Sequence, residues 1–274
     1  MVRQPALPLW RHVVFVDWHG VLSRSPFWAS IVGDARHPLH RPLRARIGRL
    51  FTDPVLMSTW MTGQRRTVDV VAGLDVQAGA RYGTDYLCRQ LERDCRSMRV
   101  NVDLLRLLQP VRERAFVVVA TDNVDSFAEA FRRLAARPAR VAAEPEAADT
   151  LAFWARACDD LICSSDMGAL KAADPQAFFG PYLAACGLRF ADALLVDDRS
   201  DNCAAFRRAG GAALRWTMHT DPLADVAAAL RAWLGDAGPA GPPSGQPPGG
   251  QDGAGEAAGF RAAAPVTGST RANA

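Results

Sequence analysis

The 274-residue sequence predicts an α/β fold in which helices flank an open parallel sheet. Four short apolar runs support this prediction, because they are hydrophobic throughout, as strands buried on both faces are. Segments with helical periodicity follow most of these runs, and strands that alternate with helices are typical of a parallel sheet. The apolar content of 49% is sufficient for a substantial core.

The predicted elements follow one another along the chain in this alternating pattern. The strands are His12–Asp17, Phe116–Ala120, Leu161–Cys163 and Ala193–Val196, with a weaker fifth at Ala212–Trp216. The helices are Val124–Ala136, Asp174–Cys186, Asp201–Ala209 and Pro222–Leu234. Open parallel sheets bind ligands at the carboxyl ends of their strands, so functional residues are expected directly after the strands.

Residues 23–99 interrupt this alternation, because they contain no convincing strand and several helical patterns. Two amphipathic helices are predicted in this region. The second is Tyr86–Met98, and the first has an apolar stripe with i, i+4, i+7 and i+8 spacing. The residues of that stripe are Leu43, Ile47, Leu50 and Phe51. Arginines on the same helix mostly face away from the stripe, which favours a solvated face over an anion-binding patch. They are Arg41, Arg44, Arg46 and Arg49.

The insertion predicts a division of the chain into domains. We expect an all-helical cap of residues 23–99 over the active edge of a core made by residues 11–22 and 100–235. Residues 236–274 are rich in Gly, Pro and Ala. Such a composition buries too little apolar surface to offset the entropy of ordering, so this tail is predicted to be disordered.

Charge and cysteine usage narrow the class of protein. The net charge of +3 gives no reason to expect a nucleic-acid or membrane partner. Six cysteines lack CxxC pairing and metal-ligand spacing, which predicts reduced thiols in a cytoplasmic protein. The sequence also lacks a signal-peptide core and an apolar run of membrane-spanning length.

Polar residues stand where the predicted strands end. The stretch VVFVDWHGVL stops its apolar run at Asp17, which either caps a turn or serves a functional site. The other residues at strand ends are Thr121, Asp197 and Asp198, and Lys171, the only lysine, follows the third strand. Because parallel strands end at one edge, three carboxylates, a hydroxyl and an ammonium are predicted to share one cleft.

Such a cluster of carboxylates needs positive charge to offset its mutual repulsion. Lys171 supplies one charge, and Mg²⁺, a hard ion that prefers oxygen ligands, would supply the rest. A site of this composition suits a phosphoryl group, whose transfer depends on positioning and charge neutralisation.

Four motifs, in this order, resemble those of the haloacid dehalogenase (HAD) superfamily. VVFVDWHGVL is similar to the first motif, and Thr121 resembles the Ser/Thr of the second. Lys171 in LKAADPQAFF resembles the lysine of the third motif, and VDDRSDN is similar to the acidic fourth motif. The helical insertion falls where the C1 cap of subfamily I does, and WMTGQRRTVDVV also resembles cap sequence. The resemblance covers about Val13–Leu234 and implies a HAD-like, Rossmann-like core with a C1 cap.

The resemblance also implies a role for each motif residue. Asp17 would attack phosphorus and form an aspartyl-phosphate. His19 replaces the second Asp of the first motif, which protonates the leaving group and then activates water; an imidazole can do both. The implied magnesium site comprises Asp17, the backbone carbonyl of His19 and Asp198, with Asp197 and Asn202 close by. The implied phosphate-binding groups are Thr121, Lys171 and the backbone amide of Asn123.

The leading hypothesis is therefore a Mg²⁺-dependent phosphatase acting on a small phosphorylated metabolite. A 2-haloacid dehalogenase needs no divalent metal and lacks the paired fourth-motif acids, so Asp197 and Asp198 argue against it. A phosphonoacetaldehyde hydrolase would need a cap lysine, and Lys171 belongs to the core site. A non-catalytic or regulatory protein with the same fold is the remaining alternative, and His19 is the residue that favours it.

The sequence leaves the substrate and the oligomeric state open. Candidate substrate contacts in the cap are Trp28, Trp60 and Arg65, although packing or exposure explains each of them equally well. Three further aspartates are interpreted as turn and cap residues: Asp122, Asp125 and Asp166.

Overall fold

The computed structural model describes residues 12–76, 81–136 and 158–236. Five strands form one sheet in the order β3–β2–β1–β4–β5, and every neighbouring pair is parallel. The strands are β1 (Val13–Val16), β2 (Phe116–Thr121), β3 (Asp160–Cys163), β4 (Ala193–Asp197) and β5 (Ala212–Arg215). This sheet confirms the predicted fold class, and each strand begins and ends within one residue of its predicted bounds.

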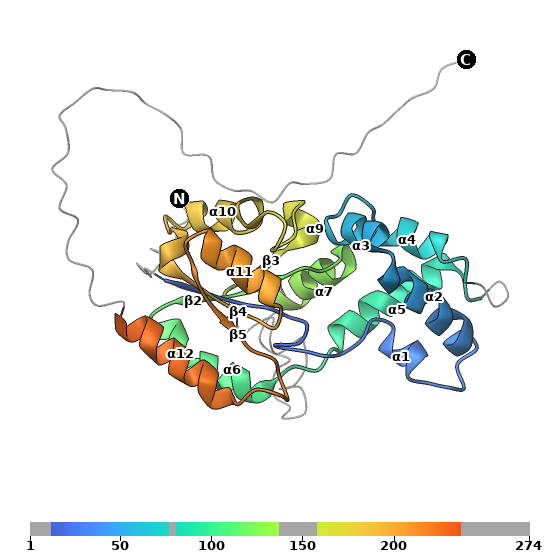
Figure 1. Ribbon diagram of the computed structural model, residues 1–274. Coiled ribbons are helices and arrows are strands. Elements are labelled where there is room, and N and C mark those ends of the chain that lie inside the picture. Colours follow the sequence, from blue (N-terminus) through green and yellow to red (C-terminus); the bar gives the residue numbers. More distant parts are fainter. Residues whose placement is uncertain (1–11, 77–80, 137–157, 237–274) are drawn as a thin grey trace, which may run out of the picture. The chain divides into compact units, whose positions relative to one another are not determined.

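Successive residues of each strand face two apolar cores, one on either side of the sheet. Val14 and Val16 of β1 belong to the first core, and Val13 and Phe15 belong to the second. Helices α6 (Val102–Leu108), α7 (Asp125–Ala135) and α12 (Leu223–Asp236) contribute to the first core. Helices α10 (Pro175–Ala185) and α11 (Ser200–Arg208) cover the opposite face, as Figure 1 shows. Burial on both faces explains why the strands read as continuous apolar runs.

Among the described residues, five helices lie between β1 and α6, in the region predicted to be helical. They are α1 (Ala29–Val32), α2 (His40–Thr52), α3 (Pro54–Met61), α4 (Thr67–Gly73) and α5 (Thr84–Arg96). Their apolar side chains, among them Leu43, Trp60 and Leu87, continue the first core, so the insertion and the sheet form one compact unit. Shorter elements are the 3₁₀ helices η1 (Pro110–Glu113) and η4 (Phe190–Asp192), and the single turn α9 (Ser164–Met167).

Polar contacts fasten the insertion to α7. Asp125, the first residue of α7, accepts hydrogen bonds from the backbone amide of Thr67 (3.2 Å) and from its hydroxyl group. The same carboxylate lies 2.7 Å from Nε of Arg66. A second ion pair joins Glu92 of α5 to Arg133 of α7. Asp125 therefore holds the insertion in place, which agrees with its interpretation as a structural residue.

Two other sequence predictions can be compared with the described residues. All six cysteines are free, as expected for reduced thiols. No described helix has both the length and the apolar character that a membrane span requires. The predicted tail lies outside the described residues except for Asp236, which is the last residue of α12.

Candidate active site

Strand β1 delivers Asp17 to the carboxyl edge of the sheet. Its backbone amide donates to the carbonyl oxygen of Val196, 2.9 Å away, so the ladder with β4 continues up to the carboxylate. The chain then folds into a tight turn, in which the amides of Leu22 and Ser23 both donate to the carbonyl of Trp18. These bonds hold Asp17 in a buried position, where 5% of the residue is exposed.

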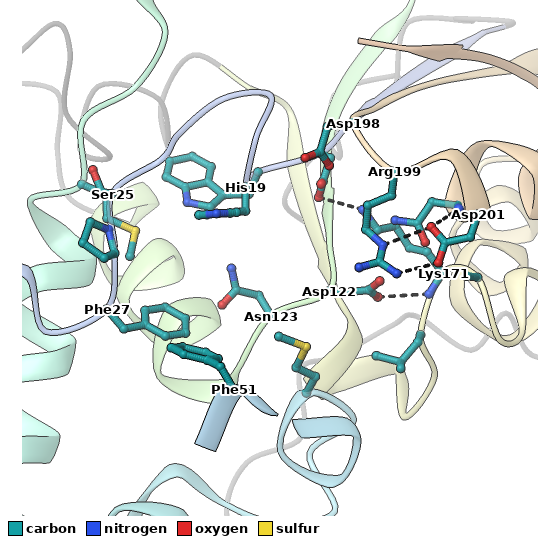
Figure 2. A pocket seen from close by; sticks show the side chains of 18 of the residues that line it. His19, Ser25, Phe27, Phe51, Asp122, Asn123, Lys171, Asp198, Arg199 and Asp201 are labelled. Atoms are coloured by element: carbon teal, nitrogen blue, oxygen red, sulfur yellow. Dashed lines mark hydrogen bonds and ion pairs between the residues drawn. The ribbon is translucent and has the colours of Figure 1, made fainter. Parts of the chain in front are cut away.

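Lys171 lies between two carboxylates of the sheet edge. Its Nζ is 2.7 Å from Oδ1 of Asp17 and 2.6 Å from Oδ2 of Asp197, and it also donates to the carbonyl oxygen of Ala120 at 3.2 Å. Only 1% of the residue is exposed. The backbone amide of Lys171 donates to Oδ1 of Asp122 at 3.0 Å, so the loop that carries the lysine is tied to the end of β2 (Figure 2).

The local sequence explains how Lys171 reaches this place. Asp174 caps α10 by accepting a hydrogen bond from the amide of Ala177 at 2.9 Å, and Pro175 occupies the first helical position. The N-cap of α10 is thereby fixed three residues after the lysine. The side chain of Asp122, which sequence reasoning interpreted as a turn residue, fixes the other end of this loop.

Asp197 is fully buried, and both of its oxygens already accept hydrogen bonds. Oδ2 accepts from Lys171, Oδ1 accepts from the backbone amide of Arg199 at 2.9 Å, and the Asn202 amide donates to both oxygens at 3.1 Å. A carboxylate that accepts four hydrogen bonds from three donor groups is oriented rather than free. Asp197 therefore serves best as the group that positions Lys171.

The oxygen atoms at the sheet edge fit a divalent metal ion. Carboxylate oxygens of Asp17, Asp197 and Asp198 all lie within 4.8 Å of one another. Oδ1 of Asn202 is buried and lacks a hydrogen-bond partner within the described part of the chain, so it is an acceptor that a metal-bound water could satisfy. Since Asp197 is already saturated, Asp17 and Asp198, with the carbonyl of His19, are the groups that would hold the ion.

Gly20 makes room for Asp198 beside this cluster. Its φ of +87° favours glycine, and a Cβ atom there would lie 2.1 Å from Oδ2 of Asp198. Any side chain at this position would displace the carboxylate. The close approach of Asp198, the fourth-motif acid, thus explains why the first motif has a glycine at this position.

The charges of the site are unbalanced without a further cation. Burial is the main cause that raises the pKa of Asp17 to about 8; Lys171 opposes it and the charge of Asp197 adds to it. Burial acts to lower the pKa of Lys171, but the surrounding carboxylates outweigh it and raise the pKa above its usual value. Lys171 therefore stays an ammonium, and one ammonium does not neutralise the surrounding carboxylates.

His19 lies on the wall of the same cavity and remains exposed. The cavity walls partly desolvate its ring, which lowers the pKa; Asp198 opposes this effect and Arg24 adds to it.

A cavity of about 1070 Å³ opens from this cluster toward the insertion. Figure 2 shows Lys171, Asp122 and Asp198 on one side of it and Phe27 and Phe51 on the other. The reacting groups thus occupy one end of a space whose other end is formed by the helical insertion.

The structure places some predicted residues elsewhere. Thr121 is buried at the end of β2 and does not line the cavity. The backbone amide of Asn123 donates to Oγ of Ser164 at 2.9 Å, so this donor is already used, although the residue itself does line the cavity. In the structure Ser164 satisfies this amide, and the role of the amide in binding phosphate stays a prediction. The position of Asn123 after a strand does not reveal that Ser164 accepts a hydrogen bond from its amide.

The proposed cap contacts also need correction. Trp28 and Trp60 are fully buried in the first core, and Arg65 is not on the cavity wall. The insertion instead presents Phe27, whose neighbour Trp28 was the residue chosen from the sequence, and Phe51 from α2.

Comparisons with known proteins show which solved structures have a similar fold. No family model matches the chain, and no curated protein matches it. Among solved structures, a predicted HAD-like family hydrolase from Porphyromonas gingivalis has a TM-score of 0.55 at 15% identity, covering 81% of this chain and 98% of its own. A HAD-family enzyme from Bacteroides thetaiotaomicron, in complex with magnesium and inorganic phosphate, has a TM-score of 0.52 at 13% identity, covering 78% and 98%.

An L-2-haloacid dehalogenase has a TM-score of 0.50 at 16% identity, covering 81% of this chain and 99% of its own. At these identities the similarity concerns the fold. The protein has the fold of the HAD-like hydrolases, and its neighbours in structure include both a magnesium and phosphate complex and a dehalogenase.

Proposed function

We propose that the protein is a Mg²⁺-dependent HAD-family phosphatase that acts on a phosphate monoester through an aspartyl-phosphate on Asp17. The observation that carries the proposal is the position of Lys171, which contacts Asp17 and Asp197 beside the oxygen cluster completed by Asp198. A nucleophilic carboxylate can approach an anionic phosphoryl group only where positive charge offsets their repulsion.

The proposed reaction has two steps. In the first, a carboxylate oxygen of Asp17 forms a bond to phosphorus while the ester P–O bond breaks, and the departing oxygen takes a proton from His19. In the second, His19 accepts a proton from water, whose oxygen attacks phosphorus and breaks the acyl phosphate bond. Inorganic phosphate leaves, and Asp17 is restored as a carboxylate. Bound Mg²⁺ would supply positive charge at the phosphoryl oxygens.

Lys171 and Asp197 act together in both steps. Lys171 fixes the orientation of the Asp17 carboxylate and offsets the charge of the incoming phosphate. Asp197, held by Asn202 and by the amide of Arg199, keeps the ammonium in place. Asp122 anchors the backbone of the same lysine.

The two rival functions differ from this proposal at identifiable residues. A dehalogenase would use Asp17 on carbon and would have no need of the oxygen cluster around Asp198. A non-catalytic role rests on His19 alone, and it leaves unexplained why the nucleophile, the lysine and the acids are assembled at contact distance.

Turnover of p-nitrophenyl phosphate tests the proposal. We expect Mg²⁺-dependent release of phosphate that EDTA abolishes and that Asp17→Asn reduces to background. Acid quenching after mixing with a ³²P-labelled substrate should leave label on the wild-type protein but not on Asp17→Asn. Release of chloride from L-2-chloropropionate in EDTA, without phosphatase activity, would show that the protein is a dehalogenase. No turnover of p-nitrophenyl phosphate or of a broad panel of phosphate esters would favour the non-catalytic role.

A further inference from the structure

The wall of the cavity that faces the reacting groups is mostly apolar. It is formed mainly by side chains of the insertion and its flanking segments: Phe27, Val32, Ile47, Phe51, Met61 and Met98. Most charged groups lie at the opposite end, around Lys171 and Asp198, although Ser25 and Arg44 also line the cavity from the insertion and its flanking segment. The cavity is therefore divided into a charged end and an apolar end.

Helix α2 contributes both to the first core and to the cavity wall. Leu43 and Leu50, seven residues apart, are buried in the first core. Ile47, which also packs against this core, and Phe51, four residues further on, line the cavity. Arg44 of the same helix lines it too, although the sequence favoured a solvated face for the arginines. Phe51 is left 47% exposed, one of the few large apolar side chains in the described residues with such exposure. An aromatic side chain kept open to a cavity indicates a surface that a ligand covers.

The size of the cavity exceeds the needs of a small phosphate ester. Its volume of about 1070 Å³ lies at the upper end of pockets for drug-sized ligands, which span roughly 300 to 1,000 Å³. A phosphoryl group at Asp17 with a two-carbon alcohol would fill only a small part of this space. The rest of the wall would remain in contact with water.

The chemistry of the wall favours an apolar occupant over a polar one. Hydroxyl groups of a sugar phosphate would need hydrogen-bond partners at this end. Ser25 and Arg44 could serve a few of them, but the side chains of Phe27, Ile47 and Phe51 offer none. Burying a hydroxyl without a partner weakens binding about 5- to 150-fold, so polyols are disfavoured here. An alkyl or aryl group would instead gain by leaving water.

We propose that the substrate is a phosphate monoester of an apolar alcohol, whose alkyl or aryl group lies against Phe27 and Phe51 while its phosphate lies at Asp17 and Lys171. This inference rests on the proposed phosphatase function and names the substrate class of the same site.

A series of ethyl, butyl and hexyl phosphate tests the proposal. The three alcohols are nearly equal as leaving groups, so differences in kcat/KM report on binding of the chain. Each buried methylene is expected to raise kcat/KM about three- to four-fold, which gives on the order of 10²-fold between ethyl and hexyl phosphate. Phe51→Ala should reduce this ratio about tenfold, and Phe51→Leu should restore most of it.

Val55→Ala provides the matched control, because Val55 is 71% exposed and does not line the cavity. It should leave the hexyl-to-ethyl ratio unchanged. Equal kcat/KM values across the series would overturn the proposal while leaving the phosphatase function intact.

Calorimetric binding of ethylphosphonate and hexylphosphonate in the presence of Mg²⁺ separates the two claims further. Tighter binding of hexylphosphonate, weakened by Phe51→Ala, supports the apolar wall even if no ester is hydrolysed, in which case only the proposed function fails. If hexylphosphonate binds no more tightly than ethylphosphonate, or if neither binds, the proposed substrate class is wrong.

Discussion

Replacing Lys171 by methionine removes the charge at the centre of the site while keeping most of the side-chain volume. The Nζ atom has three partners within 3.2 Å, two of them carboxylates, and all of these contacts are buried. Removing one partner of a buried ion pair costs about 3–5 kcal/mol, because the remaining charge is left uncompensated. We expect Lys171→Met to lower the free energy of unfolding by this amount, which corresponds to a fall in Tm of about 6–20 °C.

Urea unfolding in EDTA measures this effect without interference from a bound metal. Arg49→Met is the matched control, because Arg49 is an exposed cation on α2 and its loss should leave the midpoint unchanged. The same variant assayed with Mg²⁺ and p-nitrophenyl phosphate should lose on the order of 10²-fold or more in kcat. The reasoning about the site is refuted if Lys171→Met unfolds at the wild-type urea concentration. Retention of near-full turnover would equally show that the lysine is not part of the catalytic site.

Four further predictions concern other residues and segments. Gly63→Ala should destabilise the protein by about 1–3 kcal/mol. The reason is that Gly63 has a φ of +69° and that a Cβ there would lie 2.2 Å from the carbonyl oxygen of Ser165. An unchanged urea midpoint would contradict this prediction. His19→Asp should speed turnover of esters with poor leaving groups and His19→Ala should slow them most, whereas equal rates for wild type and His19→Ala across leaving groups would make the histidine a bystander. Asp198→Asn should weaken Mg²⁺ binding in calorimetry, since one of three clustered carboxylates loses its charge; an unchanged affinity would place the ion elsewhere. Removal of residues 237–274 should leave Tm and turnover unchanged, because their composition buries little apolar surface, and a drop of several degrees would refute this.

The strands and the residues at their ends could be predicted because one physical rule governs both. A strand buried on two faces must be apolar along its whole length, so its end is marked by the first charged residue. Parallel strands then bring these ends to one edge without any knowledge of side-chain packing. This is why Asp17, Lys171 and Asp197 were expected together although they are far apart in the sequence. In the structure both carboxylates lie within hydrogen-bond distance of Nζ of Lys171.

The insertion could be predicted only as helical. Leu43, Ile47, Leu50 and Phe51 form one stripe in the sequence. In the structure Leu43 and Leu50 are buried in the core, whereas Ile47 and Phe51 also line the cavity. Core and apolar cavity select the same side chains, so periodicity cannot tell them apart. The same ambiguity led to Trp28 as a candidate contact, whereas its neighbour Phe27 lines the cavity.

The burial of the only lysine gives the folded chain an unusual response to amine-reactive reagents. Lys171 is 1% exposed and its ammonium is held by two carboxylates, so acylating reagents find no lysine side chain on the surface. Acylation at this position requires the ion pairs to separate and the proton to leave. The rate of mass gain in the peptide that carries Lys171 therefore measures how often the site opens, and a ligand that closes the site should slow it, with no engineered probe.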